Sequence, residues 1–333
     1  MSAITEDELV TFLSSFRPAP QGLLAESLAE RLGYTPEQME AFRARLAEDG
    51  FSFDVLDDGR WQLADKPDKL LPYWIRAGLR CDRLGSSVYY AEEVESTQDI
   101  AFELMVEGRP HGTLVVAEHQ TSGRGREQRT WYTTAGKSLC FSVLLDLEPP
   151  DTFASVLTIA IAASVARAIQ DLAGLPARID FPNDIMVRDK KIAGILLEVK
   201  DYGVEQTRAV AGVGVNVNQL PEDFPEEIRA FASSLRIEHR EDDPIPRPRL
   251  LRYILRELEK WLDGIAKGDF EELEQEWNRF ANLVGQEVLV ERGEDKIKGR
   301  VLEASIRSGL KLRTEDGEQT IRLEHVAELD VVE

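Results

Sequence analysis

The sequence predicts an α+β protein built from successive segments with different hydrophobic periods. Short amphipathic helices come first, followed by a hairpin-like pair of strands. Strand-like and helix-like stretches then interleave through the middle of the chain, which is typical of a mixed sheet with packed helices. From Gly285 onward the hydrophobic period changes to two, which indicates a small all-β barrel. A chain of 333 residues is long enough for two or three such domains.

The composition fits a folded, acidic protein. Apolar residues make up 43% of the chain, enough for a proper core, and the net charge is −21. This charge argues against broad binding to nucleic acids and anionic membranes. Cys81, Cys140 and the four histidines are scattered, so we expect no zinc site and reduced cysteines. We find no signal-peptide pattern, and the longest uncharged stretch, 152–166, is too short to span a bilayer, so we predict a cytoplasmic protein without a membrane partner.

Residues 1–66 have the outline of a winged helix-turn-helix, three helices followed by a hairpin. The predicted elements are helices over 6–16 and 21–32, a third helix from the Thr35-Pro36 cap to Gly50, and strands over 51–55 and 61–63. The segment carries 13 acidic and 6 basic residues, a net charge of −7. Because phosphate contacts dominate affinity for DNA, we expect this surface to repel a duplex. Packing or protein contacts are the use that we predict for it.

The rest of the chain divides at composition changes. Residues 67–83 are expected to be a linker or entry segment, 84–284 a mixed α/β domain, and 285–333 the barrel. The predicted strands are 88–94, 113–117, 138–145, 185–187, 191–199, 209–215, 288–290, 296–304, 309–313 and 319–323. The predicted helices are 99–107, 153–172, 250–265 and 269–281, with loops over 219–249.

The segment Gly123–Trp131 holds two glycines, three arginines and a tryptophan. Glycines let a backbone approach a ligand closely, arginines offer donor forks for phosphate or carboxylate, and tryptophan offers a stacking face. The composition favours a loop that closes over an anion carrying a flat ring. A flexible basic surface loop is the alternative.

Two further positions have both a structural and a functional interpretation. Ser96 and Thr97 precede a predicted helix, where they can cap it or also present hydroxyls to a ligand. Lys191 begins the second strand of a predicted hairpin, where a rigid element would hold its charge in place. An ordinary turn lysine is the alternative for Lys191.

Three blocks in a fixed order carry a resemblance to a known family. They are Gly123-Arg124-Gly125-Arg126…Trp131, then Pro182-Asn183-Asp184…Lys191–Glu198, then Gly212-Val213-Gly214-Val215-Asn216-Val217-Asn218. Together they resemble biotin protein ligases, whose catalytic domain has a class II synthetase-like fold. The winged helix and a C-terminal SH3-like barrel match the layout of the bifunctional ligase/repressor subgroup.

The resemblance implies a two-step reaction with ATP, Mg²⁺ and biotin, and no tightly bound metal. Biotin is first activated to biotinyl-5'-AMP, and a lysine of a biotin carboxyl carrier domain then takes the biotin. The acceptor would belong to a biotin-dependent carboxylase. Family members often dimerise through a sheet edge, so a homodimer is one possible state of this protein.

The resemblance also implies roles for individual residues. The catalytic residues would be Lys191, Arg124 and Arg126. The biotin-binding residues would be Ser96, Thr97, Gln98, Gln120, Arg124, Gly125, Arg126, Lys191 and Gly194. The residues that bind ATP or the adenylate would be Gly123, Arg126, Arg129, Trp131, Asn183, Asp184 and Asn216, with Asp184 also a Mg²⁺ ligand.

The chain departs from the family pattern at four places. Asp180-Phe181 stand where Lys-Trp is usual, Glu127-Gln128 replace a basic residue and a glycine, and Gln98 stands where Asn is common. The stretch 325–329 lacks an arginine that many members carry. Two functions therefore remain as alternatives to that of an active ligase alone. One is a ligase that is also an adenylate-dependent transcriptional repressor, and the other is a non-catalytic biotin sensor or a lipoate-type ligase.

Overall fold

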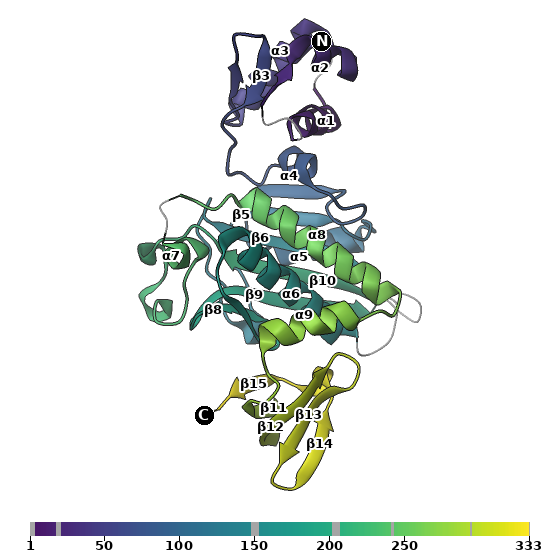
Figure 1. Cartoon of the computed structure of the whole chain (residues 1–333), viewed down its shortest axis with the longest axis vertical. Helices are drawn as coiled ribbons and strands as arrows, with labels where there is room; N and C mark the ends of the chain where they lie inside the picture. The colour runs from purple at the N-terminus through teal and green to yellow at the C-terminus, as the bar shows by residue number, and fades with distance from the viewer. Residues whose placement is uncertain are drawn as a thin grey trace. The chain divides into compact units, whose positions relative to one another are not determined.

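The computed structural model in Figure 1 describes residues 4–17, 21–147, 153–201, 207–240, 243–293 and 295–332. The chain divides into two compact units. The first comprises Met1–Arg80 with Pro246–Arg252, and the second comprises Cys81–Ile245 with Tyr253–Glu333.

The first unit packs helices on a small antiparallel sheet. Its helices are α1 (Glu6–Phe16), α2 (Ala25–Leu32), α3 (Pro36–Glu48) and α4 (Pro72–Gly78). Its strands are β1 (Leu23–Leu24), β2 (Phe53–Val55) and β3 (Arg60–Leu63), in the order β1-β3-β2. The predicted capping box is confirmed, since Thr35 accepts from the backbone N–H of Gln38 and Gln38 bonds back to Thr35. Phe12 and Phe42 stack in the core with their ring centroids 5.0 Å apart.

One predicted boundary in this unit is wrong, and one expected linker holds a helix that was not predicted. The second helix begins at Ala25 rather than at residue 21, because Leu23 and Leu24 pair with β3 instead. The expected linker contains α4, whose Tyr73 and Trp74 are buried in the same core as the other helices.

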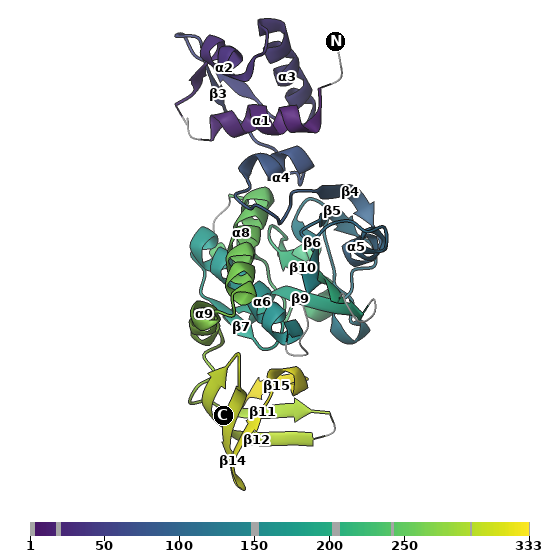
Figure 2. The same cartoon turned by 90° about the vertical axis from the view of Figure 1, so that its right-hand side faces the viewer.

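The second unit is built on a mixed sheet with the strand order β4-β5-β6-β10-β9-β8-β7. Its strands are β4 (Val88–Val94), β5 (Leu114–Gln120), β6 (Ser138–Leu147), β7 (Ala177–Asp180), β8 (Asp184–Val187), β9 (Lys190–Asp201) and β10 (Thr207–Asn216). β4 and β5 run parallel, whereas the other neighbours are antiparallel. Helix α5 (Thr97–Val106) covers one face of the sheet, and α6 (Phe153–Ala173) and α9 (Glu271–Ala281) cover the other, as Figure 2 shows.

Helix α6 is a core helix. By length and composition Ala154–Ala173 could cross a membrane, but 72% of its apolar window is buried within the protein. The prediction of a buried apolar helix is therefore confirmed. Helix α8 (Arg247–Ala266), the short helix α7 (Leu235–His239) and single 3₁₀ turns complete this part of the chain.

The C-terminal residues form an antiparallel sheet with the order β14-β13-β12-β11-β15. Its strands are β11 (Glu287–Arg292), β12 (Asp295–Ser305), β13 (Gly309–Thr314), β14 (Gly317–Ile321) and β15 (Glu328–Val331). The alternating pattern predicted the first four, but β15 was not expected. It is short and pairs with β11 only from Glu328 to Val331. It was therefore not recognisable from its own hydrophobic pattern, and only its pairing with β11 identifies it as a strand.

Candidate active site

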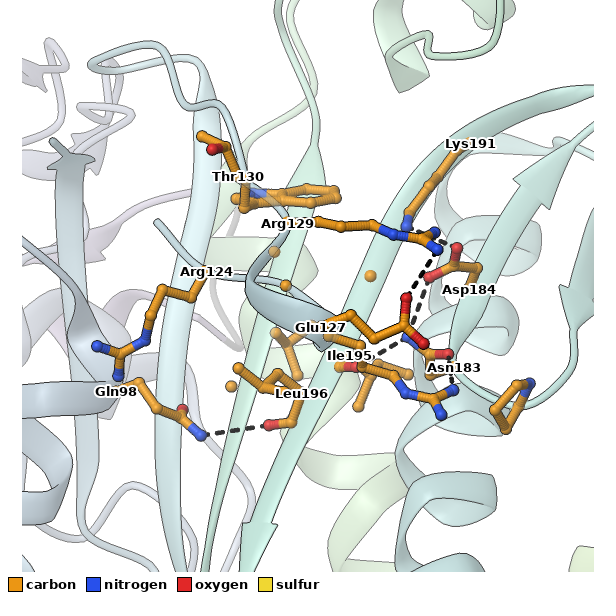
Figure 3. Close-up of a pocket in the computed structure, with 18 of the residues that line it drawn as sticks. Gln98, Arg124, Glu127, Arg129, Thr130, Asn183, Asp184, Lys191, Ile195 and Leu196 are labelled. Atoms are coloured by element: carbon orange, nitrogen blue, oxygen red, sulfur yellow. Dashed lines mark hydrogen bonds and ion pairs between the residues drawn. The ribbon is translucent and has the colours of Figure 1, made fainter. Parts of the chain in front are cut away.

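A cavity of about 260 Å³ lies in the second unit. Gly212 and Gly214 of β10 line it, on the same face of that strand as Val210, which packs against α5. The cavity is lined by Ser96–Gln98, Gln120, residues 124–127 and 129–131, Ser142, residues 180–184, Lys191, residues 194–196, residues 212–214 and residues 328–330. Figure 3 shows Gln98 and Arg124 at one end of this pocket and Lys191 and Asp184 at the other.

Glycines on neighbouring strands leave room on the floor of the pocket. Gly214 on β10 pairs with Gly194 on β9, Gly194 pairs with Asp184 on β8, and Asp184 pairs with Asp180 on β7. These residues therefore form one row across the strands. The indole of Trp131 lies over the two glycines, where a Cβ on Gly214 would overlap the ring and one on Gly194 would come within 3.2 Å of it.

Buried hydroxyls and amides form the first end of the pocket. Gln120 Oε1 accepts from the backbone N–H of Thr97 at 2.8 Å and from its hydroxyl at 3.0 Å. The hydroxyls of Thr97 and Ser142 lie 2.9 Å apart. Ser96 caps α5 by accepting from the N–H of Gln98. Such a cluster suits a small polar group that both donates and accepts hydrogen bonds.

Gln98 ties this end of the pocket to the sheet. Its Nε2 donates to the carbonyls of Leu196 at 3.3 Å and Val210 at 3.1 Å, and its Oε1 accepts from Ser142 at 3.0 Å. A Cβ on Gly212 would lie 2.5 Å from that Oε1. Glutamine here therefore depends on glycine at position 212.

Lys191, Asp184, Asn183 and Arg126 form the second end. Lys191 Nζ lies 2.6 Å from Asp184 Oδ2, and Arg126 donates to Asn183 Oδ1 at 2.9 Å. Asn183 Nδ2 donates to Asp184 Oδ1 at 3.2 Å and to the carbonyl of Ile195 at 3.1 Å. Burial raises the pKa of the Asp184 carboxyl, and Lys191 offsets part of that rise. This end can neutralise an anion and hold it in a fixed orientation.

The predicted Gly/Arg loop is folded over the pocket. The N–H of Gly125 donates to the carbonyl of Arg129 at 2.7 Å, and that of Trp131 donates to Gly123 at 2.8 Å. Glu127 has a φ of 54°, a left-handed conformation that is uncommon outside glycine.

The arginines of the loop point in different directions. Arg124 binds Asp99 through both ends of its fork, at 2.6 and 3.0 Å, and points away from Lys191 (Figure 3). Arg129 reaches across toward Lys191 and Asp184, where its fork meets Glu127 at 2.9 Å. The loop therefore brings Arg126 and Arg129, but not Arg124, to the second end of the pocket.

The C-terminal sheet also contributes to the pocket. Arg126 donates to the carbonyl of Ala327 at 3.1 Å, and Arg129 lies 3.5 Å from Glu328. Glu328, Leu329 and Asp330 line the cavity. The sequence drew attention to 325–329 only through an arginine that is missing there, and it did not indicate these residues as part of the site, because they lie far along the chain from the three motifs.

Asp180, whose negative charge departs from the family pattern, is paired. Arg178 donates to Asp180 Oδ1 at 2.6 Å. The two residues are separated by one position on β7, so their side chains share a face of the strand. Within the described ranges, no group of three or more His, Cys, Asp or Glu residues could hold a metal ion.

The structure brings most of the predicted site residues to one cavity, with two exceptions. Gly123 begins the loop and does not line the cavity; a Cβ there would come within 2.5 Å of the Trp131 carbonyl. Asn216 is buried beside the pocket region, where its amide donates to Ser233 at 3.0 Å and accepts from Gln219 at 2.9 Å. Lining residues that the sequence did not suggest include Thr130, Ser142, Ile195, Leu196, Glu328, Leu329 and Asp330.

Comparison with known proteins is consistent with this arrangement. Residues 90–216 match the model of the biotin/lipoate A/B protein ligase family. The chain is 30% identical to a bifunctional ligase/repressor, BirA, of Bacillus subtilis over 292 residues, which cover 88% of this chain and 89% of that protein. It is 25% identical to the Escherichia coli protein of the same name over 235 residues, 70% of this chain and 71% of that one.

A solved structure shares the fold. The biotin protein ligase from Aquifex aeolicus, in complex with biotin and ATP, superposes with a TM-score of 0.62 at 29% identity. The match covers 74% of this chain and all of that one. With the pocket, the loop and these similarities taken together, the chain belongs to the biotin protein ligase family.

Proposed function

We propose that this protein is an ATP-dependent biotin protein ligase that loads biotin onto a biotin carboxyl carrier domain. The pocket is the observation that carries the proposal. One cavity joins a buried cluster of hydroxyls and amides to a cluster of Lys191, Arg126 and Asn183. The first suits the ureido ring of biotin, and the second suits a carboxylate that meets a phosphate.

In the first step a biotin carboxylate oxygen attacks the α-phosphorus of ATP. The new P–O bond gives biotinyl-5'-AMP, and the bond to the β-phosphate breaks to release pyrophosphate. Such phosphoryl chemistry depends on positioning and on charge neutralisation more than on covalent help. Lys191 would bind the carboxylate and the α-phosphate, and Arg126 would hold the acyl phosphate from the loop side.

The remaining predicted residues divide between the two substrates. Ser96, Thr97, Gln98 and Gln120 would bind the ureido end, and Arg124 would join them after leaving Asp99. Gly125 and Gly194 would allow close approach of the biotin chain. Arg129, Trp131 and Asn183 would face the nucleotide. Gly123 would support the loop, and Asn216, which lies outside the cavity, would support the end of β10 through its bonds to Ser233 and Gln219. The loop would close as a lid, which excludes water from a hydrolysable intermediate.

Mg²⁺ would enter with ATP and neutralise phosphate charge. The Asp184 carboxylate at the second end of the pocket fits this use, because Mg²⁺ in nucleotide sites is held through one or two carboxylates plus phosphate oxygens.

In the second step the amine of an acceptor lysine attacks the acyl carbon of biotinyl-5'-AMP. An amide bond forms, the amine loses a proton, and AMP leaves. An enzyme that carries out both steps needs a lid that admits the carrier domain and still retains the adenylate.

We assign the domains on the same basis. Residues 1–66 would form a winged-helix domain, 67–83 a linker or entry segment that contains α4, 84–284 the catalytic domain and 285–333 an SH3-like domain. The helices and three-stranded sheet of the first unit and the all-β sheet at the C-terminus support these assignments. The ligase would work in the cytoplasm, where ATP and carboxylases occur.

We further propose that the N-terminal segment does not bind DNA in this protein. Its net charge of −7 supports this view, although its relative in B. subtilis is named a ligase/repressor. A gel shift with the protein's own promoter, with and without biotinyl-5'-AMP, tests the proposal. A salt-sensitive shift that needs the adenylate would overturn it.

Biotin-dependent ATP–pyrophosphate exchange tests the ligase proposal. Exchange with biotin but not with lipoate, followed by transfer to a carrier domain, is the expected result. Biotin binding without exchange would instead indicate a sensor, and exchange with lipoate would indicate a lipoate-type ligase.

A further inference from the structure

The pocket continues past Lys191 into a region rich in carboxylates. Asp180, Glu328 and Asp330 line this end. Of the cations at this end, Lys191 is paired with Asp184 and Arg129 with Glu127. Arg126 is held by Asn183 and by the carbonyl of Ala327. A polyanion in this region needs a further cation.

The sheet fixes the direction in which a triphosphate would extend. The hydroxyl and amide cluster lies toward β6, whereas Lys191 and Asp184 lie on β9 and β8. A substrate that starts in the cluster and reacts beside Lys191 points toward β7. Its leaving group therefore lies over Asp180, the next residue of the row after Asp184, at a side-chain spacing of about 5 Å.

Arg178 is the cation that β7 supplies at that place. Its guanidinium donates to Asp180 Oδ1 at 2.6 Å, and its side chain is 40% exposed. Among the hydrogen bonds between described residues, this one occupies a single N–H of the fork. Arg178 does not itself line the cavity, but it shares a face of β7 with Asp180, which does. A guanidinium fork matches phosphate oxygens well.

We propose that Arg178 binds the β- and γ-phosphates of ATP, and the pyrophosphate that leaves, while Asp180 holds its guanidinium in position. This inference rests on the proposed ligase function and adds a residue to it. The acidic Asp180 is then the anchor of a phosphate-binding arginine, so the charge reversal at position 180 does not disable the site.

Exchange kinetics at saturating Mg²⁺ test the proposal, with ATP, pyrophosphate and biotin varied in turn while the other substrates are saturating. Arg178→Gln should raise KM for ATP and for pyrophosphate by about tenfold, with KM for biotin unchanged, because it removes a charge-assisted contact to the phosphates alone. Arg178→Lys should recover part of the loss. Arg300→Gln is the matched control, because it breaks an exposed cross-strand pair with Glu287 of 3.1 Å outside the pocket; its constants should match those of the wild type.

A double variant separates phosphate binding from simple neutralisation of Asp180. Arg178→Gln with Asp180→Asn keeps a raised KM for ATP if Arg178 contacts phosphate. A return to the wild-type KM would overturn the proposal, as would equal rises in the KM values for ATP and biotin with Arg178→Gln.

Calorimetry of inorganic pyrophosphate binding tests the inference without any need for catalytic turnover. Arg178→Gln should weaken this binding about tenfold. If the wild type shows no exchange but binds pyrophosphate through Arg178, the ligase proposal fails and this inference stands. If exchange occurs, and Arg178→Gln changes neither the KM for ATP nor the affinity for pyrophosphate, the ligase proposal stands and this inference fails.

Discussion

Lys191 and Asp184 form an ion pair of 2.6 Å across neighbouring strands β9 and β8. The pair lies in the pocket with Arg126 and Asn183 beside it. Lys191 is therefore held by a rigid hairpin and a fixed partner. A charge that is oriented before the substrate arrives needs no reorganisation during the reaction.

Replacement of this lysine should separate binding from chemistry. Lys191→Ala should lower the rate of adenylation by about 10²–10³, the loss that follows removal of a preorganised transition-state donor. Biotin should still bind, because the hydroxyl and amide cluster at the other end is untouched. Pyrophosphate exchange and biotin calorimetry measure the two effects, and a near-normal exchange rate would refute the role of Lys191.

Arg126 should control how well the intermediate is retained. Arg126→Gly removes bonds to Asn183 and to the carbonyl of Ala327, and should speed loss of biotinyl-5'-AMP by about tenfold. Arg126→Ala removes the same bonds without adding backbone freedom, so it serves as the comparison. Release of labelled adenylate in a filter assay gives the rates. Unchanged retention in both variants would exclude the lid.

Gly212 and Gln98 should behave as a coupled pair. Gly212→Ala places a methyl group 2.5 Å from Gln98 Oε1, and should raise KM for biotin about tenfold because the displaced amide distorts the cluster. Gln98→Asn shortens the side chain, so adding it to Gly212→Ala should restore part of the affinity. Equal KM values for the single and double variants would show that the two positions are independent.

Asp184 should lower the stability of the fold at neutral pH. Burial raises the pKa of its carboxyl, so the folded protein holds this proton more tightly than the unfolded chain. The stability linked to the group is therefore present below the ordinary aspartate pKa of about 3.9 and is lost as pH rises through the folded-state value.

Asp184→Asn tests this linkage. Its Tm should exceed that of the wild type at pH 7, and the difference should shrink as the pH falls below the ordinary aspartate value. Asp295→Asn, which alters an exposed carboxylate on β12, is the control and should give a small change at each pH. A lower Tm for Asp184→Asn at pH 7 would contradict the prediction.

Sequence patterns predicted the elements whose signals are local. The capping box at Thr35 and the apolar face of α6 need no distant partner to be recognised. The short elements β1, α4 and β15 were not predicted, because their pairing or packing partners lie elsewhere in the chain. Tertiary contacts override weak local propensity in such segments.

The site could be predicted where motifs carry it and not where folding assembles it. The loop, Lys191 and the Thr97 cluster follow from three motifs and a helix start. The contribution of β15 does not, because nothing near Glu328 in sequence resembles a binding motif. The pairing of Arg178 with Asp180 was accessible from their spacing on a strand, but the strand itself was not predicted.

The position of Trp131 makes the loop observable by spectroscopy. Its indole lies over Gly194 and Gly214, and its Nε1 is buried without a hydrogen-bond partner in the described part of the chain. The other tryptophans, Trp61, Trp74, Trp261 and Trp277, are fixed in cores. The emission difference between the wild type and Trp131→Phe therefore reports on this one ring. Stopped-flow fluorescence on the unlabelled protein can then test whether the loop moves when substrates bind, and at what rate.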